Sequence, residues 1–253
     1  MIRLVRSPDE PEALQRKRPE KLAALRAAYA RGEQPKISGY GDDGVKEALF
    51  LGQDRKCAYC ERREESPKNR DADHYRPKTR YWWLAWTWEN LLFACDHCNR
   101  YEKKDQFPLV DETRRLVPED VPPGGEQPLL IDPYDPSFSP QREIEFRPDD
   151  VQGQERWKPY GLTPRGDETI RICGLDRHGL LTEYKLHVNR TVWPKVERFL
   201  EIAETGSPSE IPRAWVSLKL ALFNKYQPYQ ALSRDALKIL VRPELRERYK
   251  LAL

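Results

Sequence analysis

Two Cys-x-x-Cys pairs are the feature of this sequence with the clearest chemistry. Cys57 and Cys60 form the first pair and Cys95 and Cys98 form the second, with 34 residues between the pairs. Four thiols in this paired spacing are typical of a tetrahedral zinc site. Because four thiolates leave zinc no open coordination position, we expect the site to be structural. The reacting groups should then be side chains that the zinc holds in place.

Polar side chains suited to metal-assisted hydrolysis lie between and beside the two pairs. Asp73 and His74 are adjacent in a segment that we expect to be extended, and Asn90 and Asn99 flank the second cysteine pair. The oxygens of Asp73 and Asn99 are ligands of the kind that Mg²⁺ or Mn²⁺ prefers. Side chains alternate along a strand, so His74 can face an attacking water as general base while Asp73 faces the metal. Asn90 can hold the loop that carries His74 through hydrogen bonds to backbone groups.

These residues resemble a known nuclease family. The chain is similar to the HNH endonucleases, which share a ββα-metal core, in four segments: Cys57-x-x-Cys60, Asp73-His74-x-x-Pro77-Lys78, Asn90-Leu91 and Cys95-x-x-Cys98-Asn99. The resemblance implies that His74 is the general base and that Asn90 orients its loop. It also implies that Asp73 and Asn99 bind the catalytic metal. The third position of the family motif is Asn here instead of His, as in some active members, and this favours Mg²⁺ or Mn²⁺ over zinc at the catalytic centre.

Longer stretches resemble one subgroup, the PtuB nucleases of Septu anti-phage systems and of certain retrons. They are Lys56-Cys57-Ala58-Tyr59-Cys60-Glu61, His74-Tyr75-Arg76-Pro77-Lys78, Trp86-x-Trp88-x-Asn90-Leu91-Leu92 and Lys103-Lys104-x-x-Phe107-Pro108-Leu109. This resemblance implies a defence nuclease that works with an ABC-type ATPase and cuts DNA or, in retron versions, tRNA.

Two other classes of function compete with a nuclease. A zinc-ribbon module could bind nucleic acid or protein without cutting, but such a module has no use for Asp73 and His74. A redox protein could use Cys-x-x-Cys, but two such pairs indicate metal, and no thioredoxin-like pattern surrounds them.

Composition restricts the expected partners and the expected cellular compartment. The 253 residues carry a net charge of +3, which does not by itself indicate a nucleic-acid partner. Residues 55–104 are more basic, with 12 Lys and Arg against 8 Asp and Glu. The N-terminal residues lack the apolar stretch of a signal peptide, and no apolar run of about 18 residues suggests a membrane span. With four of five cysteines in metal-type pairs and Cys173 expected to be a buried apolar side chain, we expect a cytoplasmic, reducing compartment.

The surrounding pattern predicts an α+β fold, with a zinc-stapled ββα-metal core between N-terminal helices and a mostly helical C-terminal region. We expect an N-terminal helical segment over residues 1–44, with a helix from Pro11 to Ala30 broken near Pro19. The nuclease core should cover residues 45–112 and a scaffold and partner-docking region residues 113–253. Apolar residues at helical spacing in that last region include Trp193, Phe199, Trp215 and Phe223.

Several further residues have open assignments. The aromatic block from Tyr81 to Trp88 could stack on bases, but a small zinc-held module needs large side chains, so we expect these rings to pack the core. Glu61, Lys78 and Lys103 are candidates for phosphate contacts or for supporting the site residues. We expect His97 to be a surface residue, because four thiolates already fill the zinc site.

Overall fold

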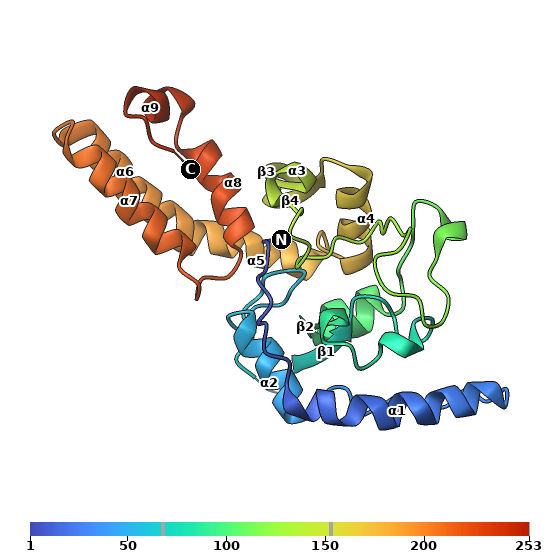
Figure 1. Ribbon diagram of the computed structural model, residues 1–253. Coiled ribbons are helices and arrows are strands. Elements are labelled where there is room, and N and C mark those ends of the chain that lie inside the picture. Colours follow the sequence, from blue (N-terminus) through green and yellow to red (C-terminus); the bar gives the residue numbers. More distant parts are fainter. Residues whose placement is uncertain (67–68, 152–153, 253) are drawn as a thin grey trace.

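The computed structural model describes residues 1–66, 69–151 and 154–252 and has a mixed α+β architecture (Figure 1). Its first part consists of two helices, a two-stranded sheet and a π-helix, in this order: α1 (Glu12–Ala30), α2 (Asp43–Gly52), β1 (Arg70–His74), β2 (Leu91–Cys95) and η4 (His97–Lys103). Short 3-10 turns at Trp82–Leu84, Trp88–Asn90 and Glu112–Arg114 complete this part.

The second part is a β-hairpin followed by helices, in this order: α3 (Pro140–Glu143), β3 (Ile144–Val151), β4 (Gln154–Gly161), α4 (Pro164–Cys173), α5 (His178–His187), η6 (Val188–Val192), α6 (Trp193–Thr205), α7 (Glu210–Phe223), α8 (Gln230–Leu240) and α9 (Pro243–Arg248). Helices α6 and α7 lie side by side and extend away from β1 and β2 (Figure 1). Among the described residues, no helix has the length and apolar character needed to cross a membrane.

The small sheet positions the residues that the sequence singled out. β1 and β2 are antiparallel, with Arg70 opposite Cys95 and His74 opposite Leu91. All five residues of β2 are buried, as the apolar run predicts, whereas β1 is partly exposed at its start. Within the described residues, the sheet consists of these two strands. The π-helix η4 follows β2 after a single residue, which gives the order strand, strand, helix.

Helix α1 continues through Pro19, which corrects the expected break. Proline lacks the N–H that would bond to the carbonyl four residues earlier, so a break is the usual result. Here contacts lie on both sides of Pro19. Leu14 and Leu25 are buried, and Tyr29 stacks on Trp82 with ring centroids 4.8 Å apart. Because these contacts fix both halves of the helix, the loss of one hydrogen bond does not interrupt it.

The aromatic block belongs to the core, as predicted. Five of its rings are at most 9% exposed: Tyr81, Trp82, Trp83, Trp86 and Trp88. Rings buried to this extent do not present faces on which a base could stack. Cys173 is also fully buried, which confirms it as a packed apolar side chain.

A buried histidine in the helical region predicts a pH-dependent stability. The Nε2 atom of His187 lies 2.8 Å from the hydroxyl of Ser233, and burial lowers the pKa of His187 to about 4. The unfolded chain, with a histidine pKa of about 6.5, binds more protons between these two values. Stability should therefore fall as the pH drops from about 6.5 towards 4.

Between about pH 7 and about pH 4.5, the unfolding free energy should fall by about 2 kcal/mol less in His187→Gln than in the wild type, because glutamine does not titrate. Urea unfolding at about pH 7 and about pH 4.5 measures the difference. An equal loss in the variant and the wild type would contradict the assignment.

Candidate metal centre and active site

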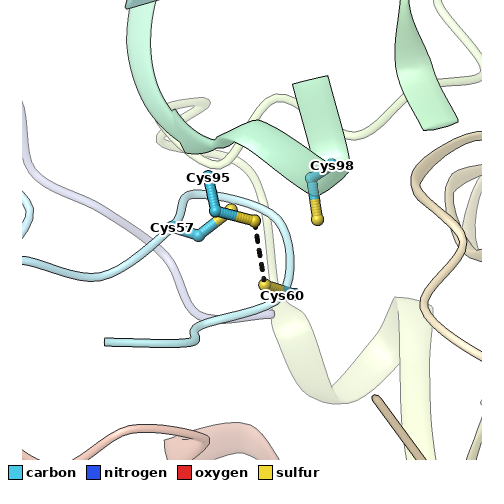
Figure 2. Close-up of side chains that lie close together, drawn as sticks. All are labelled: Cys57, Cys60, Cys95 and Cys98. Atoms are coloured by element: carbon cyan, nitrogen blue, oxygen red, sulfur yellow. Dashed lines mark hydrogen bonds between the residues drawn. The ribbon is translucent and has the colours of Figure 1, made fainter. Parts of the chain in front are cut away.

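The four paired cysteines converge on one point in the interior (Figure 2). Their Sγ atoms all lie within 4.8 Å of one another, and those of Cys60 and Cys95 are 3.9 Å apart. Zinc–sulfur bonds of about 2.3 Å in a tetrahedron place sulfurs about 3.8 Å apart. All four side chains are buried. The cluster is therefore compatible with a structural zinc ion.

Local backbone structure brings the two pairs together. Cys57 and Cys60 lie in a turn closed by a β-bridge between Lys56 and Arg63. The N–H of Ala58 donates to the carbonyl of Phe93 at 3.0 Å and fixes this turn against β2. Cys95 is the last residue of β2 and Cys98 lies in the first turn of η4, so the two pairs join the turn, the sheet and the π-helix.

A cation from the C-terminal region approaches the thiols. One guanidinium nitrogen of Arg177 lies 3.6 Å from Sγ of Cys98 and also donates to the carbonyls of Cys173 and Gly174. Hydrogen bonds from the other three thiols, together with the charge of Arg177, hold the pKa of Cys60 well below its ordinary value. A thiolate is the form that binds zinc, so this environment favours the ligating form of Cys60. Sequence reasoning missed Arg177, because its distance along the chain gives no local signal.

His74, at the end of β1, is buried and held in one orientation. Its Nε2 atom lies 3.0 Å from the carbonyl oxygen of Ala85. A carbonyl only accepts, so Nε2 carries the proton and Nδ1 is the basic nitrogen. Burial, together with the nearby charges of Lys78 and Lys103, lowers the pKa of His74 to about 3. The imidazole is therefore neutral at physiological pH, and the value near 6.5 of an exposed histidine does not apply.

Asp73, the residue before His74 on β1, is held by two other side chains. Its Oδ2 atom accepts a hydrogen bond from the Tyr59 hydroxyl at 2.8 Å, and the ammonium of Lys103 lies 3.2 Å from the same oxygen. Burial raises the pKa of Tyr59 well above its ordinary value, so the phenol stays protonated and donates. Lys103 also donates to the carbonyl of His74 at 2.7 Å and so joins both residues to η4.

Asn99 is oriented by a residue that sequence reasoning missed. Its Nδ2 atom donates to a carboxylate oxygen of Asp71 at 3.0 Å, and Arg100 binds the same carboxylate with two nitrogens at 2.6 and 2.7 Å. This contact fixes the amide, so Oδ1 is its available oxygen. Within residues 1–66, 69–151 and 154–252, no donor bonds to that oxygen.

These side chains meet in a pocket of about 210 Å³ lined by residues of β1 and η4, among others. Asp73, His74 and Asn99 all line it. A carboxylate and an amide oxygen are the donor set of a hard cation such as Mg²⁺ or Mn²⁺, which keeps several waters and needs few protein ligands. The carboxylate oxygens of Asp73 retain lone pairs beyond those used by Tyr59 and Lys103, so the donor set fits such a cation.

Asn90 joins the two sides of the loop between β1 and β2. Its Oδ1 accepts from the N–H of Arg76 at 2.8 Å, while Nδ2 donates to the carbonyls of Arg76 and Leu84 at 3.0 and 3.3 Å. Leu84 directly precedes Ala85, whose carbonyl holds His74. A displacement of this loop would therefore disturb the imidazole.

We expect Asn90→Ala to destabilise the fold by about 1–3 kcal/mol for each polar group that it leaves buried and unpaired. Thermal unfolding measures this loss. Asn90→Asp should also destabilise, because a carboxylate cannot donate to the two carbonyls. Unchanged melting in both variants would show that the loop does not depend on Asn90.

Of the three candidates for phosphate contact or for supporting the site residues, Glu61 and Lys103 are buried. Lys103 is fully buried against Asp73, and a carboxylate oxygen of buried Glu61 accepts from the N–H of Ala231 at 3.2 Å. Their positions exclude direct contact with a nucleic acid. Lys78, by contrast, lines the pocket. The His97 side chain is 42% exposed and pairs with Glu102, as expected of a surface histidine.

Taken together, the fold and the cysteine cluster define an α+β protein with a buried metal-type site beside a polar pocket. The chain is 32% identical to the Septu protein PtuB of Bacillus mycoides (strain KBAB4) over 165 residues, which cover 56% of this chain and 55% of that protein. It is 40% identical to the Septu protein PtuB of Bacillus thuringiensis over 63 residues, or 24% of each chain. The chain is thus a homologue of PtuB.

The matched region is limited. The alignment spans about half the length of the first relative and about a quarter of the second. No family model matches the chain, and no solved structure matches it.

Proposed function

We propose that the protein is an HNH-type, metal-dependent endonuclease that hydrolyses phosphodiester bonds of nucleic acid. The observation that supports this most is the state of His74: neutral, oriented through Nε2, and lining one pocket with Asp73 and Asn99. A zinc-bound module without catalytic function has no need for a basic nitrogen held in this way.

In the proposed reaction, Nδ1 of His74 takes a proton from the water that attacks phosphorus, and the bond to the leaving oxygen breaks. The hydrogen bond to Ala85 keeps Nδ1 unprotonated and fixed in direction. A pKa of about 3 makes free His74 a weak base. A bound phosphodiester would raise this pKa and a bound cation would lower it, because an opposite charge favours the protonated imidazole and a like charge disfavours it.

The other residues serve to bind and to orient. Asp73 and Asn99 would hold Mg²⁺ or Mn²⁺, which stabilises negative charge on the phosphate and the leaving oxygen. Lys103 and Tyr59 fix the Asp73 carboxylate, and Asp71 fixes the Asn99 amide.

Metal dependence tests this function. Purified, zinc-containing protein should nick supercoiled plasmid when Mg²⁺ or Mn²⁺ is added and should stop when EDTA is added. Binding of nucleic acid without any cleavage under these conditions would favour the alternative, a zinc-ribbon binding module.

We further propose that the protein is an anti-phage defence effector, with DNA as its leading substrate and tRNA as the alternative. The support is the similarity to Septu protein PtuB together with the subgroup motifs. The same resemblance implies an ABC-type ATPase as partner.

The C-terminal helices offer a surface for that partner. Val216 and Leu220, one turn apart on α7, are 51% and 69% exposed, and Ile239 on α8 is 45% exposed. A hollow of about 370 Å³ is lined by residues of α6 and α7, among them Phe199 and Leu218. Helices α6 and α7 extend away from β1 (Figure 1). Exposed apolar side chains are typical of protein interfaces.

We expect Leu220→Glu to abolish co-purification with the ABC-type ATPase while nuclease activity remains. Val121→Glu is the matched control, because Val121 is 80% exposed but lies outside these helices. Retention of the ATPase by the Leu220 variant, or its loss from the Val121 variant, would contradict docking at this surface.

A further inference from the structure

The segment that joins α1 to α2 also lines the site, although no motif includes it. Residues 34–42, here called the strap, contribute to three hollows of about 210, 390 and 340 Å³. The first two share Tyr40, Asn99 and Arg100, and the third shares Lys78 with the first. The shared lining residues place the three hollows next to one another, and together they are called the groove.

The strap is held close to β1. A Cβ on Gly41 would lie 3.2 Å from Cβ of Ala72, so only glycine allows this approach without movement. Gly39 has a φ of +83°, which other residues rarely adopt. Asp42 pairs with Lys17 of α1. These contacts hold the Tyr40 ring edge-on to His74, with centroids 4.3 Å apart and an interplanar angle of 67°.

The groove has an excess of positive charge. Three of its carboxylates already have cationic partners, in the pairs Asp42–Lys17, Asp71–Arg100 and Asp73–Lys103. Four lysines that line it have no carboxylate partner among the described side chains: Lys36, Lys46, Lys78 and Lys104. Asp105 is the remaining acidic side chain in the lining.

We propose that this groove binds one unpaired polynucleotide strand, with its phosphates on the lysines that line the groove and Tyr40 packed against the nucleotide beside the scissile phosphate. This inference rests on the proposed nuclease function and names its substrate class; a negatively supercoiled plasmid offers such strands where its duplex opens. A cationic groove with an aromatic ring is the general pattern of single-strand binding. The hollows of about 390 and 340 Å³ have the size of a small-ligand site, which suits one nucleotide at a time.

The test measures binding of a labelled single-stranded oligonucleotide across a salt series, without added divalent metal. Each phosphate contact contributes about 0.7 to the slope of log affinity against log salt for a single strand. Lys36→Ala/Lys46→Ala should therefore reduce the slope by about 1.4. The control is Lys225→Ala/Lys250→Ala, which removes two exposed lysines outside the groove. Tyr40→Leu should weaken binding, whereas Tyr40→Phe, which keeps the ring, should restore it.

Two results would overturn the proposal: a duplex of the same sequence that binds more tightly than the single strand, or a slope that falls equally in the groove and control variants. Hydrolysis of bis(p-nitrophenyl) phosphate by wild type and His74→Ala separates this proposal from the nuclease function. Absence of His74-dependent hydrolysis of both this small diester and nucleic acid would contradict the nuclease. Single-strand binding that depends on Lys36 and Lys46 would still stand in that case.

Discussion

Replacing His74 with alanine is expected to reduce the cleavage rate by a factor of about 10²–10⁴, the usual contribution of a general base. The zinc content should not change, because His74 lies at the end of β1 opposite Leu91, while the thiols gather where β1 begins opposite Cys95. Initial rates of plasmid nicking at saturating Mg²⁺ measure the effect.

His97→Ala is the matched control for this variant. His97 lies within the second cysteine pair, but its side chain is 42% exposed and bonds to Glu102 instead of lining the pocket. It should cut at the wild-type rate. A comparable loss of activity in both histidine variants would show that the effect does not come from a base at His74.

Replacing Cys95 with serine is expected to release the zinc and unfold or aggregate the protein. Structural zinc sites contribute apparent free energies of about 10–16 kcal/mol, which exceeds the stability of most domains. Cys95 joins β2 to η4, so its loss affects the elements that carry Asp73 and Asn99 as well. Elemental analysis and thermal unfolding measure the two effects.

Cys173→Ala is the control for the cysteine experiment, since Cys173 is equally buried but outside the cluster. It should keep its zinc and lose only a small amount of packing. Wild-type protein without bound zinc, or a Cys95→Ser variant with unchanged melting, would contradict a structural zinc site.

The parts of the site that could be predicted from sequence are those specified by local spacing. The paired cysteines lie within turns of four residues, and the apolar run from Leu91 to Cys95 forms a buried strand as its composition predicts.

The parts that could not be predicted depend on contacts between distant segments. Tyr40, Tyr59 and Asp71 reach the site from separate elements, and no local pattern marks them. Lysine is usually found at the surface, yet Lys103 is buried, and its pairing with Asp73 offsets the cost of burying its charge. The continuity of α1 through Pro19 likewise depends on packing against the aromatic block. In each case a tertiary contact outweighs a local preference.

The pKa of His74 could likewise not be predicted from the sequence. From sequence, a histidine next to an aspartate suggests a group that titrates near neutral pH. Burial instead lowers its pKa to about 3. Only the folded environment reveals this low pKa. The charge of the bound phosphate would therefore affect the strength of His74 as a base.

One assay tests most directly whether His74 is the general base of a metal-dependent nuclease: nicking of supercoiled plasmid by wild type, His74→Ala and His97→Ala, each with its zinc content measured. We predict Mg²⁺- or Mn²⁺-dependent nicking by wild type and His97→Ala. We predict a loss of at least about 100-fold in His74→Ala at equal zinc content. Equal nicking by His74→Ala and wild type, at equal zinc content, would contradict this role of His74.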